Sequence, residues 1–200
     1  MFRFRLRHPR LFVATFAILA AAAVIVFLVS AGGDSRPDYP YSVLVFEDQG
    51  REHLPVGQGY DFYNSNPPTS GPHSAQPAAW GVHEEPVAKE APVHNMEHGG
   101  VVIWYDCTFV TEGLPAGPRQ VSVGQILADP ACVELRDKLA SVVESALADG
   151  KLVLMVPYQE MGHPIAMTAW RTLDTLDEFD AARIQAFIDH YERLFNPEGF

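Results

Sequence analysis

An uncharged apolar stretch at residues 11–31 sets the strongest limit on how this 200-residue chain can fold. Its length is close to the roughly 20 apolar residues that a helix needs to span a bilayer. Residues 1–10 carry four arginines and no acidic side chain, and the positive-inside tendency keeps such an arm in the cytoplasm. We therefore expect a cytoplasmic basic arm at 1–10, a transmembrane anchor at 11–31, and an extracytoplasmic remainder.

A cleaved signal peptide is the alternative, because Val29-Ser30-Ala31 resembles a small-residue cleavage site. The apolar stretch is longer than the usual signal-peptide core of about 7–15 residues, which favours an uncleaved anchor. Residues 32–37 then form a short linker, and 38–200 form one extracytoplasmic domain. The expected location is the cytoplasmic membrane, with a single pass and the N-terminus inside.

The charge of the chain limits the partners of that domain. The formal net charge is −11, and four of the 14 basic residues lie in the N-terminal arm. Residues 11–200 therefore carry 10 basic and 25 acidic side chains, a formal charge of −15. Such a surface repels nucleic acid and favours cations, so we expect no nucleic-acid partner. Contact with the membrane is expected only through the anchor, and protein partners are not predicted.

Two cysteines, Cys107 and Cys132, both lie in the part expected outside the cytoplasm. An even number of cysteines in an oxidising compartment favours a disulfide bond. Two free buried thiols are the alternative.

Strand and helix patterns predict an α+β domain with a largely antiparallel sheet and two main helices, preceded by the transmembrane helix. The first main helix has Asp129 as its cap, Pro130 at its first position and Gly150 after its end. The second begins between residues 175 and 180 and stops at Asn196-Pro197. Strands are expected at 41–46, 53–57, 101–106, 120–123, 151–158 and 164–171.

The segment 94–98, His-Asn-Met-Glu-His, concentrates most of the potential chemistry. On a helix, His94 and His98 share one face with Glu97 beside them, which matches the H-x-x-E-H pattern of inverted zinc peptidases. On an extended segment, His94, Met96 and His98 point the same way and form a nitrogen and sulfur set suited to copper. Both conformations remain open at this point.

Further metal ligands must come from other segments. The stretch 60–79 has no periodicity but contains Pro67, Pro68 and Pro72, which predict a stiff loop that presents His73. Met161 and His163, on a short connection before the strand at 164–171, are less favoured donors. His53 and His83 rank lower still.

The chain resembles a family of bacterial and archaeal membrane-anchored proteins catalogued as a domain of unknown function. The resemblance rests on three segments: 66–73 with P-P-T-S-G-P-H, 94–99 with H-x-x-E-H-G, and 164–170 with a late A-W pair. It covers about residues 50–195. Met96 stands where the pattern often has Leu, which weakens a copper site built on thioethers.

The resemblance implies a shared polar site formed by His73, His94, Glu97 and His98, and it implies no reaction. Our leading hypothesis is a membrane-anchored domain that binds copper or zinc through these residues, for metal handling or as an accessory in the cell envelope. The alternative is a metal-free structural or interaction module, in which the same side chains join the long loop to the sheet. A fainter alternative is a metallohydrolase with Glu97 as its base.

Overall fold

The computed structural model describes residues 36–110, 122–159 and 161–196. Contacts divide the chain into two units, 1–36 and 37–200, and every described helix and strand belongs to the second. Within the described ranges no helix is long and apolar enough to cross a membrane. The expected arm and anchor at 1–31 lie outside the described residues.

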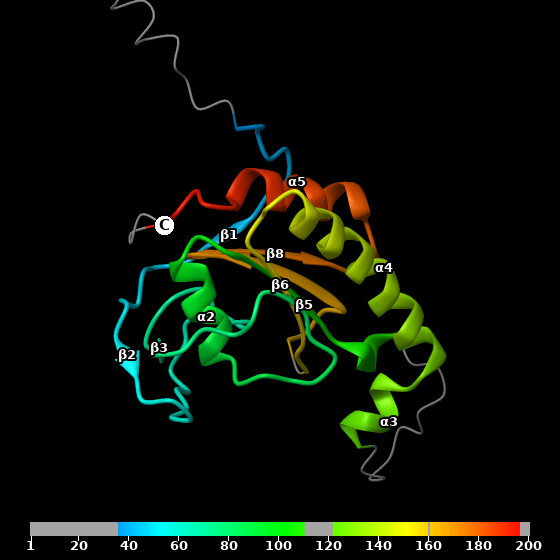
Figure 1. Ribbon diagram of the computed structural model, residues 1–200, viewed down its shortest axis with the longest axis horizontal. Coiled ribbons are helices and arrows are strands. Elements are labelled where there is room, and N and C mark those ends of the chain that lie inside the picture. The colour runs from blue at the N-terminus through cyan, green and yellow to red at the C-terminus, as the bar shows by residue number, and fades with distance from the viewer. Residues whose placement is uncertain (1–35, 111–121, 160, 197–200) are drawn as a thin grey trace, which may run out of the picture. The chain divides into compact units, whose positions relative to one another are not determined.

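A six-stranded sheet forms the centre of the domain (Figure 1). The order is β1-β8-β7-β5-β6-β4, and the first three pairings are antiparallel while the last two are parallel. The expected α+β class with a mostly antiparallel sheet is therefore confirmed. The strands of this sheet are β1 Leu44–Val45, β4 Gly81–Val82, β5 Val101–Tyr105, β6 Val153–Pro157, β7 Ile165–Ala169 and β8 Thr172–Leu176.

The central strand β5 is buried along its whole length, as its unbroken apolar sequence predicts. Successive side chains of a strand point to opposite faces, so β5 contributes to two separate cores. Val101, Ile103 and Tyr105 belong to one core, whereas Val102 and Trp104 belong to the other. Both faces of the sheet must therefore be covered by other elements.

Two long helices cover the first face (Figure 1). They are α4 Pro130–Ala148, which packs against β6 and β4, and α5 Ala181–Tyr191, which packs against β7. Asp129 caps α4 by accepting a hydrogen bond from the Ala131 amide, and Pro130 is its first residue, as expected. Asp180 caps α5 in the same way through the Arg183 amide.

The second face is covered by a shorter helix, α2 Glu90–Glu97, and by a separate two-stranded ribbon of β2 His53–Leu54 and β3 His73–Ser74. Helix α2 packs against both β3 and β5. Its side chains Val93 and Met96 are fully buried and join Val102 and Trp104 in the second core. This layer contains the candidate site.

Several sequence-based expectations for the elements are wrong. The strand expected at 120–123 is contradicted in its described part, because Ser122 caps the short helix α3 Val123–Leu127 with a capping box to Gln125. Residues 120 and 121 lie outside the described residues. The second main helix ends at Tyr191 and not at Asn196-Pro197.

Strand β8 was not expected, because its central residue Asp174 interrupts the apolar pattern. That carboxylate is buried, and it accepts two hydrogen bonds from the guanidinium of Arg183, at 2.9 and 2.5 Å, and one from the Tyr39 hydroxyl. Burial and the neighbouring carboxylate raise the pKa of Tyr39, so its hydroxyl keeps the proton that it donates. These partners of Asp174 come from α5 and from the segment before β1. The sequence around Asp174 therefore does not predict them.

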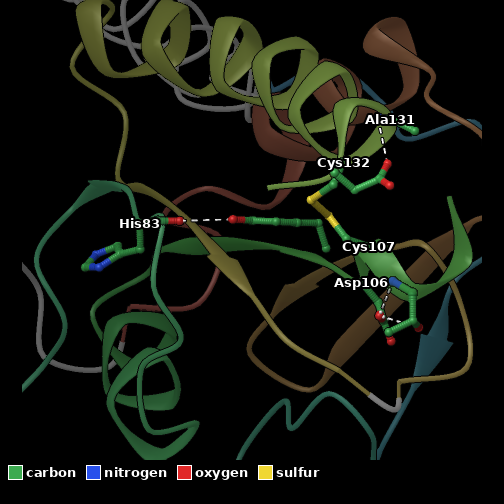
Figure 2. Close-up of a disulfide and its surroundings, with 8 residues drawn as sticks. His83, Asp106, Cys107, Ala131 and Cys132 are labelled. Carbon is green, nitrogen blue, oxygen red and sulfur yellow. Dashed lines mark hydrogen bonds between the residues drawn. A yellow bond between two sulfur atoms is a disulfide. The ribbon is translucent and has the colours of Figure 1, made fainter. Parts of the chain in front are cut away.

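The expected disulfide between Cys107 and Cys132 is present, as Figure 2 shows. Cys107 begins the single turn η1 Cys107–Phe109 that follows β5, and Cys132 lies in the first turn of α4. The two sulfur-bearing residues are buried, with 2% and 0% of their surface exposed. The bond therefore ties the central strand to the helix that covers it.

Removing this disulfide should lower the free energy of unfolding by about 3 kcal/mol, because a loop of about 25 residues would no longer be closed in the unfolded chain. The change is the double variant Cys107→Ala and Cys132→Ala, measured by urea denaturation of the full-length protein in mild detergent. Adding reductant to the natural protein should give a similar loss. Unchanged stability in both cases would contradict the structural role assigned to the bond.

Candidate metal centre

The ribbon of β2 and β3 brings two histidines together from opposite ends of a long connection. The strands are parallel, and His53 lies directly opposite His73 in their register. The His73 amide donates to the Glu52 carbonyl, and the Ala75 amide donates to the Leu54 carbonyl. Both imidazoles lie near α2, and their ring centroids are 4.9 Å apart.

Helix α2 supplies the other donors, which confirms the helical alternative for the described segment 94–97. The helix begins at Glu90, so Pro92 falls in its first turn, where no intrahelical partner for its missing N–H is needed. His94 and Glu97 are three residues apart and share one face. The extended alternative is wrong, and with it the convergence of Met96 with the two histidines.

The two glycines after the motif have separate roles. Gly99 has a φ of 83°, the left-handed conformation that ends many helices, and its amide donates to the Met96 carbonyl. Gly100 allows a close approach, because a Cβ there would lie 2.4 Å from the ring of Trp80 and 2.8 Å from the Asn95 carbonyl oxygen. The chain can therefore turn from α2 directly into β5.

Four side chains meet between α2 and the ribbon: His53, His73, His94 and Glu97. Each offers one donor atom, and these atoms lie within 4.8 Å of one another. His73 Nε2 lies 3.0 Å and His53 Nε2 3.3 Å from the same oxygen, Glu97 Oε2. Three imidazoles and one carboxylate form a set that can hold a transition-metal ion.

Burial differs sharply among the four residues. His73 is completely buried, and the side chains of His94 and Glu97 are also buried, whereas the His53 side chain is 45% exposed. Arg51, on the same edge, places its Nε 3.9 Å from Glu97 Oε1 but is itself half exposed. The cluster is therefore closed by the protein on one side and reaches solvent through His53.

Backbone carbonyls fix the orientation of the two buried imidazoles. His73 Nδ1 donates to the Gly71 carbonyl at 2.8 Å, and His94 Nδ1 donates to the Ser74 carbonyl at 2.7 Å. A carbonyl only accepts, so Nδ1 carries the proton in each ring, and Nε2 is the nitrogen that can offer a lone pair. His73 Nε2 lies against Glu97 Oε2, whereas His94 Nε2 lies 2.7 Å from His98 Nε2. Histidine ligands of metals commonly have this arrangement, because the second hydrogen bond sets the tautomer.

The contact between His73 Nε2 and Glu97 Oε2 requires a proton or a cation between the two atoms. If His73 is neutral, its Nε2 has a lone pair that faces the Glu97 carboxylate, and the two acceptors repel each other. A second proton on the ring or a shared cation between the two atoms removes this conflict. A buried carboxylate without such a partner would cost several kcal/mol.

His94 favours the neutral, ligating form. Burial lowers its pKa, with a smaller lowering from the neighbouring imidazoles of His73, His98 and His53, while the bond to the Ser74 carbonyl acts in the opposite direction. His94 Nε2 then accepts a hydrogen bond from His98 Nε2, 2.7 Å away.

Three of the four residues expected from the resemblance come together in the cluster: His73, His94 and Glu97. His98 is not one of the four converging donors, and it contacts the cluster through His94. His53 was underrated, because its position opposite His73 depends on strand pairing across 20 residues of sequence. The one available signal was a histidine on an expected edge segment.

The less favoured donors lie elsewhere. Met96 and Met161 are 0% and 5% exposed and pack in the second core with Val93 and Trp104. The side chain of His163 is 41% exposed, and its Nδ1 lies 3.1 Å from Asp177. Both thioethers are therefore part of the apolar packing of the second core.

Replacing Met96 with leucine should leave metal binding unchanged, because the side chain fills the core and does not face the cluster. The swap conserves volume, so the free energy of unfolding should change by less than about 1.5 kcal/mol. Copper and zinc titrations of the Met96→Leu protein test this expectation. A selective loss of copper affinity would instead assign the thioether to the site.

Comparison with known proteins gives one family. The family model described as "Protein of unknown function (DUF3105)" matches residues 60–116 and 126–199, a range that includes His73, His94 and Glu97 but not His53. No curated protein and no solved structure matches the chain. The expected membership in a family of unknown function is thereby confirmed, and the chain belongs to the DUF3105 family.

Proposed function

We propose that this protein is a membrane-anchored, extracytoplasmic domain that binds one divalent transition-metal ion through His53, His73, His94 and Glu97. One observation carries the proposal: backbone carbonyls hold Nδ1 of the two buried imidazoles, and both rings converge with His53 and Glu97 so that one donor atom of each residue lies within 4.8 Å of the others. If these side chains served only as hydrogen-bond partners, metal-donor atoms from three separate segments of the chain would not need to converge.

The donor set indicates which ions fit. Imidazole and carboxylate groups suit zinc and copper(II), whereas copper(I) prefers thiolate or thioether sulfur. The two cysteines are joined in the disulfide, and Met96 and Met161 lie in the core. We therefore propose zinc or copper(II) as the bound ion.

The uneven burial of the donors supports a role in metal handling. His73, His94 and Glu97 form a fixed, buried wall, and His53 closes the site from the solvent side. An exposed imidazole on a two-residue edge strand can move away without disturbing the core. Such an arrangement allows an ion to enter and leave, as exchange with partners in the cell envelope requires.

The metal-free module remains the second candidate, and one specific observation favours it. Hydrogen-bond contacts alone already join α2 to both strands of the ribbon, through Glu97 to His53 and His73 and through His94 to Ser74. In this case a second proton on His73 supplies the positive charge. The hydrolase alternative lacks comparable support, because Glu97 Oε2 contacts two imidazoles and Oε1 lies 3.9 Å from Arg51 Nε, so neither oxygen is without a neighbour.

Metal analysis of the full-length protein in mild detergent separates the two candidates. After loading with zinc or copper(II) and removal of excess ion, the natural protein should retain about one ion per chain. His94→Gln and Glu97→Gln should lose it, because each removes one donor from the buried wall. His53→Ala removes the exposed ligand and should leave the core packing unchanged. This variant should bind the ion more weakly and release it faster.

His163→Gln is the matched control, because it removes an exposed histidine outside the cluster. Circular dichroism establishes that each variant is folded. No stoichiometric ion in the folded natural protein would eliminate the metal proposal and leave the metal-free module. Equal retention by the natural protein and all three cluster variants would place the ion elsewhere.

A further inference from the structure

A cavity of about 360 Å³ lies beside the metal centre and is not part of it. Its wall is formed by three segments: residues 56–59, residues 74–77 and residues 88–91 at the start of α2. Most of the lining is apolar or uncharged, and Glu90 is its one charged side chain. The volume is within the range of small-molecule sites, about 300–1,000 Å³.

Glu90 is a buried carboxylate that is only partly satisfied. The residue is 4% exposed, and its Oε1 accepts a hydrogen bond from the Tyr60 amide at 2.8 Å. In the described part of the chain its Oε2 has no hydrogen-bond donor and no cation within ion-pair distance. The neighbouring Lys89 is directed to Asp61, 3.4 Å away.

Such a carboxylate lowers the stability of the folded protein unless it has a second role. A buried carboxylate needs donors for its oxygens or an opposite charge, and an oxygen left without a partner loses the hydrogen bonds that water would give it. A glutamine would keep the bond from the Tyr60 amide without a buried charge. The position therefore has the character of a site for a ligand that donates hydrogen bonds.

We propose that this cavity binds a small aliphatic ammonium ligand, with the charged head at Glu90 and the stem along the apolar wall. A primary ammonium group offers three donors and matches one carboxylate oxygen that has free lone pairs. Val56, Pro77 and Ala88, which are exposed at the open side of the cavity, and the half-buried Ala91 supply the apolar contact for the stem. The acidic surface of residues 11–200 attracts the same class of ligand.

The cavity and the metal centre share one helix and one strand. Glu90 and His94 are four residues apart and occupy the same face of α2, about 6 Å apart along its axis. Ser74 lines the cavity, and its carbonyl accepts the hydrogen bond that orients His94. A ligand in the cavity is therefore separated from the metal-binding imidazole by a single residue, although its binding does not require the metal.

The test uses the full-length protein, labelled with nitrogen-15, in small bicelles of zwitterionic lipid. Butylammonium is the probe, and n-butanol is its neutral counterpart. Butylammonium should shift the amide signals of Gly57, Gly59 and Ala91 in a saturable way. Butanol should bind about tenfold more weakly or worse, because it lacks the charge-assisted hydrogen bond.

Three variants make the assignment specific. Glu90→Gln should weaken butylammonium binding by about tenfold, whereas Glu85→Gln, the same change at an exposed position, should have no effect. Gly59→Leu places an apolar side chain beside the carboxylate, since a Cβ there would lie 3.9 Å from Glu90 Oε1, and it should also block binding. Equal binding of butanol and butylammonium, or undiminished binding by folded Glu90→Gln and Gly59→Leu proteins, would overturn the proposal.

Discussion

The buried carboxylate of Glu97 is the constraint on which the architecture of the second face depends. An ionised group in this position must be matched by positive charge or by donors, and α2 alone cannot provide them. The partners come from a ribbon whose two strands are 20 residues apart in sequence. The long proline-rich connection can then be understood as the means of returning His73 to α2 at a fixed position. Electrostatics thus links a helix, two short strands and a loop.

The rigid part of the molecule lies on the opposite side of the same sheet. Strand β5 contributes alternate side chains to both cores, so the position of α2 is coupled to the packing of α4 and α5. The disulfide connects the end of β5 to the beginning of α4. The site is therefore presented by a short, locally weak helix that a well-packed sheet holds in place. Such support is what a precise set of ligands requires.

Helix α2 organises two different kinds of acidic site on one face. Glu97 is surrounded by imidazoles, which suit a metal ion, whereas Glu90 faces a mostly apolar cavity, which suits an organic cation. The distinction arises from the neighbours and not from the carboxylates themselves. Ser74 of β3 lies between the two positions, because it lines the cavity and its carbonyl accepts the hydrogen bond from His94.

The sequence by itself determined the elements whose signals are local. The apolar run of β5, the Asp129-Pro130 start of α4 and the pairing of two cysteines are all set by neighbouring residues or by a simple count. The family resemblance also directed attention to His73, His94 and Glu97. Tertiary structure decided the rest. An eight-residue helix that contains Pro92 is marginal alone, and burial of Val93 and Met96 against the sheet stabilises it. His53 joins the cluster only because β2 pairs with β3, and Asp174 is tolerated in β8 only because Arg183 and Tyr39 reach it. These features depend on contacts between residues that are far apart in the sequence. A local sequence pattern cannot indicate the free energy of such contacts.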